Sequence, residues 1–133
     1  MRLNEIYNTY RERVHFELIY IREAHSADGW VSPTNLYEEI HYNQPKTYSE
    51  RTEMAGVCQI NLGLELPMLI DTIDNATEEN YIAKPDRFFV IDGVGKILFN
   101  GAHGPAGCDP DAWEAAIAGA LEATSAERSL ETR

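Results

Sequence analysis

A carboxylate and an imidazole, Glu23 and His25, lie two residues apart in the stretch IYIREAHSADGW at residues 19–30. In extended backbone, residues two apart point to the same side, so both side chains can face one space. Such a pair can relay protons near neutral pH, because histidine titrates there and a neighbouring carboxylate tunes it. The same spacing also occurs in solvated loops, so spacing alone leaves both interpretations open.

Two aromatic residues flank this pair, and each has a structural and a chemical interpretation. Tyr20 lies in a short apolar run and is expected to pack in a sheet, with the alternative that its hydroxyl reaches Glu23 and His25. Trp30 follows a polar turn and either fills the core or forms the wall of a pocket, because an indole buries a large apolar area.

The two cysteines, Cys58 and Cys108, are too few for a disulfide framework and lack the CxxC spacing of redox motifs. Cys58 falls on the apolar side of a predicted helix and is expected to be an inert thiol. Cys108 ends the glycine-rich stretch GAHGPAGC at residues 101–108, just ahead of a predicted helix N-terminus. A helix N-terminus can stabilise a thiolate, so Cys108 is the alternative nucleophile within the chain.

No metal or phosphate site is expected from the motifs. The stretch GVGK at residues 93–96 lies in a predicted hairpin turn and lacks the strand–loop–helix context of a phosphate-binding loop. The glycine-rich stretch either lines a pocket or only connects two elements. The histidines are dispersed and lack the paired spacing of zinc ligands: His15, His25, His41 and His103.

The composition of the 133 residues is that of one ordinary globular domain, with 44% hydrophobic and 25% charged residues. The formal charge of −11 argues against nucleic acid or an anionic membrane as a partner, because phosphates would repel it. The sequence shows no signal-peptide pattern and no apolar run of about 20 residues, so we expect a cytoplasmic protein. The expected domain spans residues 1–123, followed by a polar, disordered tail over residues 124–133.

Helical and strand patterns alternate along the chain and predict a mixed α/β layer fold. The leading helix should be the crossover of a right-handed βαβ unit, yet no strand pattern precedes it. The expected strands cover residues 16–21, 67–72, 87–92 and 96–101, the last two as a hairpin, and the expected helices lie over residues 3–14, 34–40, 49–62 and 74–82 and from Asp109-Pro110 onward.

These pieces together resemble the iodothyronine deiodinase family, a branch of the thioredoxin-like redoxins. The stretch YIREAHSADGW at residues 20–30 is similar to the family's Y-I-x-E-A-H-P-S-D-G-W segment. Further similarity lies in SERTEMA at 49–55, in residues 66–92 and in GKILFNGAHGP at 95–105. The resemblance runs over nearly all of residues 3–121.

The resemblance implies a thioredoxin-like mixed sheet with flanking helices. It also implies that Glu23 and His25, with Tyr20 behind them, stand beside a cysteine or selenocysteine nucleophile and handle its protons. His25 would be a candidate acid for the substrate carbon or the leaving group. Pro85 resembles the loop position that faces the nucleophile, and His103 stands where the family often has a basic residue, so with Trp30 both are expected to bind substrate.

The chain departs from the family at three places. The strand and loop that carry the nucleophile precede the first helix in the family and do not match any residues of this chain. We therefore expect Met1 to be an internal methionine, with an upstream selenocysteine codon read as a stop. Residues 43–50 lack the histidine that contacts thyronine in vertebrate deiodinases, and Leu66 replaces a cysteine that can resolve the oxidised nucleophile, which argues against thyroid hormone as the physiological substrate.

The function expected from this resemblance is that of a deiodinase-like selenol or thiol oxidoreductase. It would act on an iodinated aromatic compound or a peroxide and be reset by an external thiol, without a bound cofactor. The alternatives are a peroxiredoxin-like thiol peroxidase and a non-catalytic thioredoxin-like binding module. In any of them, sheet edges left open by a missing strand would favour a homodimer.

Overall fold

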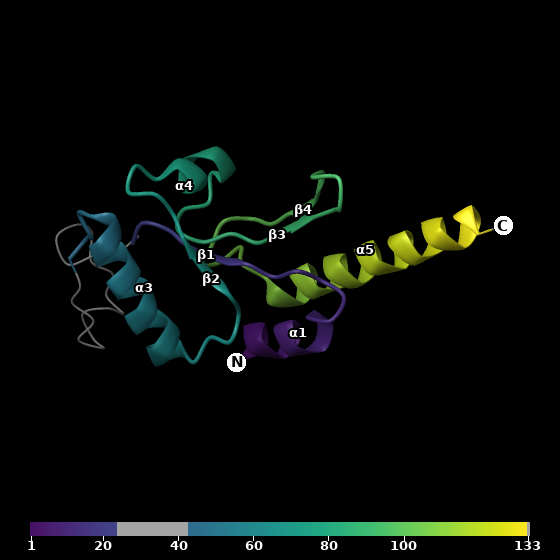
Figure 1. Ribbon diagram of the computed structural model, residues 1–133, viewed down its shortest axis with the longest axis horizontal. Coiled ribbons are helices and arrows are strands. Elements are labelled where there is room, and N and C mark those ends of the chain that lie inside the picture. The colour runs from purple at the N-terminus through teal and green to yellow at the C-terminus, as the bar shows by residue number, and fades with distance from the viewer. Residues whose placement is uncertain (24–42, 133) are drawn as a thin grey trace. The chain divides into compact units, whose positions relative to one another are not determined.

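The computed structural model describes residues 1–23 and 43–132, and Figure 1 labels its elements. The chain divides into two compact units, Met1–Pro85, here called unit 1, and Asp86–Arg133, called unit 2. The single domain expected over residues 1–123 stays a prediction. The strand pairing gives the physical basis of the division, because each of the two hydrogen-bonded strand pairs lies wholly within one unit.

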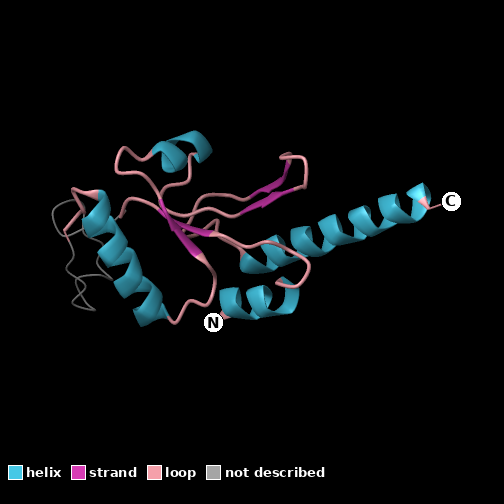
Figure 2. Ribbon diagram, viewed as in Figure 1, coloured by secondary structure: helices cyan, strands magenta, loops and turns pink. Residues whose placement is uncertain are grey.

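Unit 1 is built on a parallel pair of short strands, β1 (Leu18–Tyr20) and β2 (Met68–Ile70), drawn in magenta in Figure 2. Both strands lie inside the predicted apolar runs, and their register pairs Tyr20 with Ile70. The prediction that residues 16–21 contain a parallel strand is confirmed. The prediction that other elements cover both faces of this strand is not confirmed. Ile19 and its partner Leu69 are 40% and 52% exposed in the described part of the chain.

The leading helix, α1 (Arg2–Tyr10), confirms the amphipathic helix expected at the N-terminus, with Ile6 fully buried. Two hydrogen bonds of the Asn4 side-chain amide connect this helix to Gly63 and Glu65. The Asn4 side chain donates to the carbonyl of Gly63 over 2.7 Å and accepts from the backbone N–H of Glu65 over 3.0 Å.

Local capping sets both ends of α3 (Tyr48–Leu62), which packs against β2. The Thr47 hydroxyl accepts from the backbone N–H of Glu50 over 3.1 Å, and the Glu50 carboxylate accepts from the N–H of Lys46 over 2.7 Å. The helix ends at Gly63, whose φ of 62° is in the left-handed region that favours glycine. The predicted helix and its stop are confirmed.

The short helix α4 (Ala76–Tyr81) follows β2, as the turn residues of this segment predict. Both flanking residues, Asn75 and Ile82, have positive φ angles, of 63° and 51°. Its residue Glu78 is buried, which is unusual for a carboxylate in a six-residue helix. The helix expected over residues 34–40 lies outside the described residues.

Unit 2 contains the predicted hairpin, formed by antiparallel strands β3 (Phe89–Ile91) and β4 (Ile97–Asn100). Asp92 organises the turn, since its carboxylate accepts from the backbone N–H of Val94 over 3.0 Å and of Lys96 over 2.8 Å.

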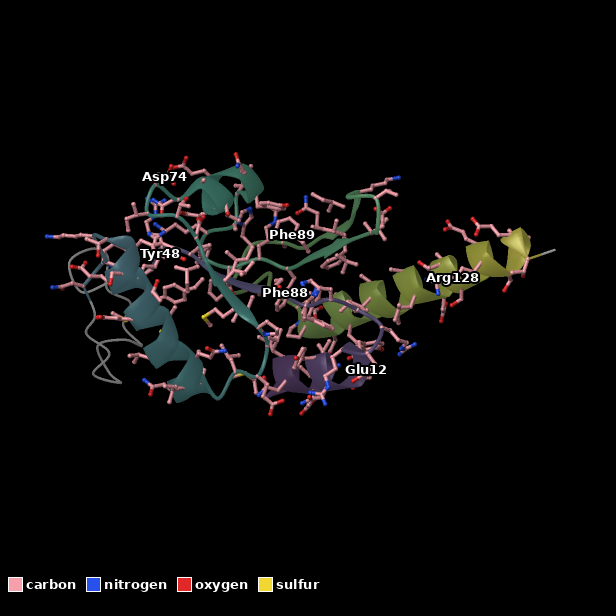
Figure 3. The ribbon with its side chains drawn as sticks, viewed as in Figure 1. Glu12, Tyr48, Asp74, Phe88, Phe89 and Arg128 are labelled. Atoms are coloured by element: carbon pink, nitrogen blue, oxygen red, sulfur yellow. The ribbon has the colours of Figure 1, made fainter. Side chains whose placement is uncertain are left out.

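The last helix, α5 (Pro110–Glu131), begins at the predicted Asp109-Pro110 pair, and the Asp109 carboxylate accepts from two N–H groups of the first turn. Trp113 of this helix is buried and donates from its indole to the carbonyl of Phe89 over 2.9 Å. Its ring stacks on Phe88 with 4.7 Å between centroids. Figure 3 labels Phe88 and Phe89 among the side chains.

The helix α5 continues through residues 124–131, which the sequence predicts as a disordered tail. Alanine, glutamate, arginine and leucine all favour helix, and serine and threonine hydroxyls here bond back to the preceding turn, as Thr124 does to Ala120 over 3.0 Å. None of the helices in the described part is both long and apolar enough to cross a membrane. The alternation of helices and strands confirms the mixed α/β class.

The cap of α3 gives a prediction on stability. Thr47→Ala removes the hydroxyl that accepts from Glu50 and should lower the free energy of unfolding by about 1 kcal/mol. Thr52→Ala in the same helix is the matched control and should leave stability unchanged or slightly higher, because Thr52 is exposed and bonds only to the Tyr48 carbonyl. Urea unfolding of both variants measures the difference, and equal stabilities would contradict the capping role.

Candidate functional site

The end of β1 brings three polar side chains together, here called the strand-end site: Tyr20, Glu23 and Cys58. The Tyr20 hydroxyl donates to the carboxylate of Glu23, three residues on, and lies 4.0 Å from the sulfur of Cys58 on α3. Both interpretations of Tyr20 hold in part, because it pairs with Ile70 in the sheet and its hydroxyl reaches Glu23, whereas His25 lies outside the described residues. The catalytic roles of Tyr20 and Glu23 stay predictions.

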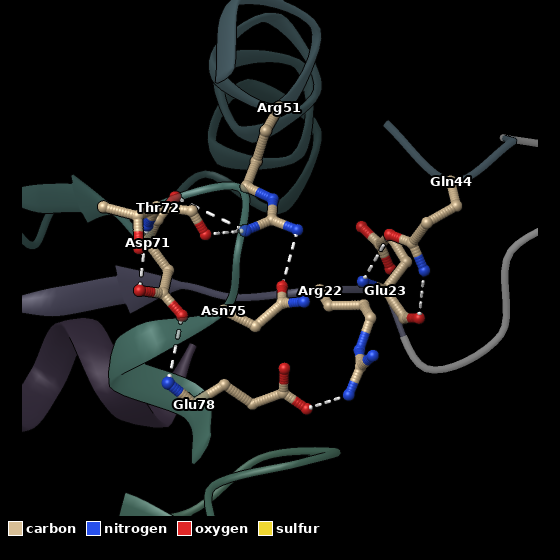
Figure 4. A network of polar contacts seen from close by, with 8 residues as sticks. All are labelled: Arg22, Glu23, Gln44, Arg51, Asp71, Thr72, Asn75 and Glu78. Atoms are coloured by element: carbon tan, nitrogen blue, oxygen red, sulfur yellow. Dashed lines mark hydrogen bonds and ion pairs between the residues drawn. The ribbon is translucent and has the colours of Figure 1, made fainter. Parts of the chain in front are cut away.

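Gln44 fixes the backbone of Glu23 from both sides. Its side-chain amide donates to the Glu23 carbonyl over 2.8 Å, and its side-chain oxygen accepts from the Glu23 N–H over 3.1 Å (Figure 4). This pair of bonds reproduces the pairing that a neighbouring strand would give. Sequence reasoning missed Gln44, because 21 residues separate it from its partner and no local pattern links them.

Burial and the Glu23 charge set the protonation states in the strand-end site. Burial raises the pKa of the Tyr20 phenol, and the hydrogen bond to Glu23 and the charge of that carboxylate raise it further. Burial also raises the pKa of the Cys58 thiol, as does the Glu23 charge, against an opposing hydrogen bond from Tyr20. Tyr20 is therefore a neutral donor and Cys58 a thiol near neutral pH, which agrees with the expectation that Cys58 is inert.

Behind the strand-end site lies a set of charged and amide side chains, here called the anchor network: Arg22, Arg51, Asp71, Asn75 and Glu78. Arg22, which precedes Glu23, forms an ion pair with Glu78 of α4 at 2.9 Å. The Glu78 side chain is 4% exposed and the Arg22 side chain 36% exposed. Figure 4 shows this pair and the rest of the network.

Asp71 caps α4 with its side chain. Its two carboxylate oxygens accept from the backbone N–H groups of Thr72, Thr77 and Glu78 over 2.9 to 3.0 Å. Burial alone would raise the pKa of Asp71, but these hydrogen bonds together lower it below the ordinary value of an aspartate. Asp71 is thus charged in the folded protein and satisfies N–H groups that the start of a helix leaves unpaired.

Arg51 joins α3 to the segment between β2 and α4. This side chain is 1% exposed, donates to the Thr72 carbonyl over 2.7 Å and to the Asn75 side-chain oxygen over 2.8 Å. Sequence reasoning also missed Arg51, Asp71 and Glu78. The one available signal was Asp71, a charged residue directly after the apolar run MLI.

The other residues predicted for the site are His25, Trp30, Pro85 and His103. His25 and Trp30 are outside the described residues. Pro85 is the last residue of unit 1, is half-buried and follows a cis peptide bond. His103 is exposed in the loop after β4 in unit 2, where its carbonyl accepts from the N–H of Gly107 over 3.0 Å.

Cys108 does not have the properties of an activated nucleophile. Burial raises the pKa of the Cys108 thiol to about 12, together with a hydrogen bond to Asp86 and the charge of that carboxylate. These effects outweigh the helix N-terminus that the sequence interpretation relied on. Within the described residues, no three histidine, cysteine or carboxylate side chains are grouped so that they could hold a metal ion.

Comparison with known proteins identifies relatives over most of the chain. A family model described as iodothyronine deiodinase matches residues 2–117. Type I iodothyronine deiodinase of Xenopus laevis is 31% identical over 108 residues, which are 81% of this chain and 40% of that protein. Thyroxine 5-deiodinase of Gallus gallus is 34% identical over 93 residues, 69% of this chain and 34% of that protein. The chain thus spans well under half the length of these relatives.

The charge of Asp71 predicts how stability depends on pH. Because its pKa is lowered on folding, its contribution is complete above about pH 4 and is lost as the pH falls through the folded value. Asp71→Asn should lower the free energy of unfolding by about 1 to 3 kcal/mol at pH 7. It should also reduce the acid limb, which is the decrease of that free energy as the pH falls below about 4. Asp74→Asn, at an exposed aspartate in the same loop, should leave that limb intact. An acid limb unchanged in Asp71→Asn would contradict this assignment.

Cys108 gives a second prediction. With a pKa of about 12, only about one Cys108 in ten thousand is a thiolate at pH 8, so iodoacetamide should modify it slowly. Asp86→Asn should speed this modification several-fold, because the negative charge beside the thiol is lost. Glu127→Gln removes an exposed charge from the same unit and should not change the rate. Rapid modification of the parent protein would show that Cys108 is activated after all.

Proposed function

The chain belongs to the iodothyronine deiodinase family, which is thioredoxin-like, and from this premise we propose that it serves the reductive removal of iodine from an iodinated phenol. The resemblance seen in the sequence is confirmed by the family match over residues 2–117. The observation that carries the proposal is the contact of a neutral Tyr20 with Glu23 at the end of β1. This contact orients a carboxylate two residues before His25 in the sequence, and protons would be exchanged through these two side chains.

The reaction has three balanced steps. A thiol or selenol of the enzyme attacks the iodine of the aryl iodide, so the carbon–iodine bond breaks, a chalcogen–iodine bond forms and the ring carbon takes up the proton. An external thiol then displaces iodide and leaves a mixed disulfide or selenenyl sulfide. A second thiol releases the reduced enzyme and an external disulfide, so the substrate gains the two electrons that the thiols lose. No bound cofactor enters these steps.

Glu23 and His25 would manage the proton in the first step. A proton must leave the nucleophile before attack and reach the ring carbon as iodine departs. Tyr20 donates to the Glu23 carboxylate and orients it, which suits a group that accepts a proton and passes it on. His25 is the partner with a pKa range suited to both transfers near neutral pH.

The nucleophile is assigned to neither cysteine of these 133 residues. Both thiols have raised pKa values, Cys58 through burial and the Glu23 charge, and Cys108 through burial and Asp86. The proposal therefore requires a cysteine or selenocysteine from sequence that is not among these residues. The relatives extend well beyond the matched part of this chain.

The substrate class is an iodinated phenol other than thyroid hormone. Residues 43–50 contain no histidine, and Leu66 stands where vertebrate relatives carry a second cysteine. Trp30, Pro85 and His103 are the residues proposed to hold the substrate. Among these, His103 would favour a phenolate or another anion, because it alone can carry a positive charge.

Iodide release tests this proposal. The protein expressed with the coding sequence that precedes residue 1 should release iodide from a diiodophenol in the presence of dithiothreitol, whereas the 133 residues alone should not. Glu23→Gln in the longer protein should lower the rate by about a hundredfold or more, because a proton-transfer group is lost. Glu12→Gln, a charge removed from a side chain that is 89% exposed, is the matched control and should keep full activity.

Three results would contradict the proposal. One is an upstream sequence with neither an in-frame cysteine codon nor an in-frame UGA codon. Another is consumption of peroxide without any release of iodide, which would place the protein among thiol peroxidases. The third is full activity in Glu23→Gln.

A further inference from the structure

Three of the four positions from residue 20 to residue 23, at the end of β1, are held by three different parts of unit 1. The Tyr20 carbonyl accepts from the backbone N–H of Asp71 over 2.9 Å. The Arg22 side chain pairs with Glu78 at 2.9 Å, and Gln44 bonds both backbone groups of Glu23. The chain that carries the strand-end site is therefore fixed at residue 20, at residue 22 and at residue 23.

The Glu78 end of the Arg22 contact is rigidly supported. The backbone N–H of Glu78 donates to the buried Asp71 carboxylate over 3.0 Å, so the first turn of α4 is fixed to the end of β2. Arg51 braces the same segment from α3 through Thr72 and Asn75. A carboxylate mounted on such a support can impose a position on a longer and more exposed partner such as Arg22.

Stability alone explains this ion pair poorly. Glu78 is buried, and its second carboxylate oxygen has no hydrogen-bond partner among the described residues, nor has the buried Nε of Arg22. Removing two charges from water is costly, and a pair joined by one hydrogen bond recovers little of that cost. A contact of this kind is better explained by the geometry that it fixes.

We propose that Arg22 and Glu78 are positioning residues, whose ion pair holds the end of β1 so that the Glu23 carboxylate stays on the Tyr20 hydroxyl. Neither side chain is placed in contact with substrate, and their effect passes through the backbone to the next residue. The importance of this geometry for catalysis rests on the proposed function of Glu23, but the geometry itself can be tested without turnover.

Cys58 reports the position of Glu23. The Glu23 charge is one of the causes that raise the Cys58 pKa, next to burial, and the Tyr20 hydroxyl lies 4.0 Å from its sulfur. If Glu23 swings away from Tyr20, that repulsion falls and Tyr20 is left to donate to the thiolate. The pKa of Cys58 should then decrease. In a Cys108→Ser background, the rate of iodoacetamide alkylation against pH reads this value directly, because Cys58 is the remaining cysteine.

The variants Arg22→Gln and Glu78→Gln distinguish a positioning role from a direct electrostatic effect of the two charges on Cys58. Glu23→Gln removes the Glu23 charge completely, so it gives the largest decrease in the Cys58 pKa, with which the other variants are compared. If the ion pair positions Glu23, Arg22→Gln and Glu78→Gln should both lower the Cys58 pKa, by roughly half of that decrease or more. If the two side chains acted only as distant charges, loss of the Arg22 cation would raise the Cys58 pKa and loss of the Glu78 anion would lower it.

The controls use the same chemistry at matched positions. Glu79→Gln removes the neighbouring, exposed carboxylate of α4 and should leave the titration unchanged. Arg22→Lys keeps a cation that can donate to Glu78 and should restore the parent titration, which a general loosening of the fold would not do. If Glu78→Gln fails to fold, as circular dichroism would reveal, the two variants at the more exposed Arg22 decide the question.

The outcomes distinguish this inference from the proposed function. Decreases in both variants, with rescue by Arg22→Lys, support the positioning role. Opposite shifts, or no shift beyond that of Glu79→Gln, overturn it while leaving Glu23 as a proton-transfer residue. No shift in Glu23→Gln itself would mean that the Glu23 charge does not act on Cys58, which overturns the inference, whereas the role of Glu23 in proton transfer is decided by iodide release.

Discussion

The hydrogen bond from Tyr20 to Glu23 is the interaction on which the rest of the site depends. A half-buried carboxylate loses the water that would solvate it, and a neutral phenol replaces part of that solvation with a donor in a fixed direction. The same contact keeps the phenol protonated, because ionising Tyr20 beside Glu23 would place two negative charges together. The contact thus keeps Tyr20 a hydrogen-bond donor and orients Glu23, and the parallel register of β1 with β2 fixes where Tyr20 lies.

The anchor network contains equal numbers of positive and negative side chains, which explains how so small a unit can bury charged groups. Arg51, Asp71 and Glu78 are 1%, 2% and 3% exposed, and Arg22 adds a second cation, so two positive and two negative groups lie in one connected set. Most of their hydrogen bonds go to backbone groups of residues 71–78, from the end of β2 into the first turn of α4, whose polar groups a six-residue helix cannot satisfy alone. The network therefore gives a short, irregular segment a defined shape, and through Arg22 that shape reaches the strand-end site.

The elements could be predicted from the sequence because their signals are local. Gly63 ends α3, the glycine-bearing turn at residues 93–95 joins β3 to β4, and Asp109-Pro110 starts α5. Glu23 and Tyr20 were also found, through spacing and resemblance. Gln44, Arg51 and Glu78 were not, because a charged or amide residue in a helix or loop usually faces solvent, and only contacts 20 or more residues away along the chain bury these side chains.

The protonation of Tyr20 is the most direct test of the central contact. With tyrosine labelled at the ring carbon that bears the hydroxyl, a carbon NMR titration reports each phenol separately, and Tyr20→Phe assigns the resonance. The structure predicts that Tyr20 stays protonated well above the ordinary tyrosine pKa of about 10, and that Glu23→Gln moves its titration down toward that value. A Tyr20 that titrates at the ordinary value in the parent protein would show that the phenol does not hold Glu23.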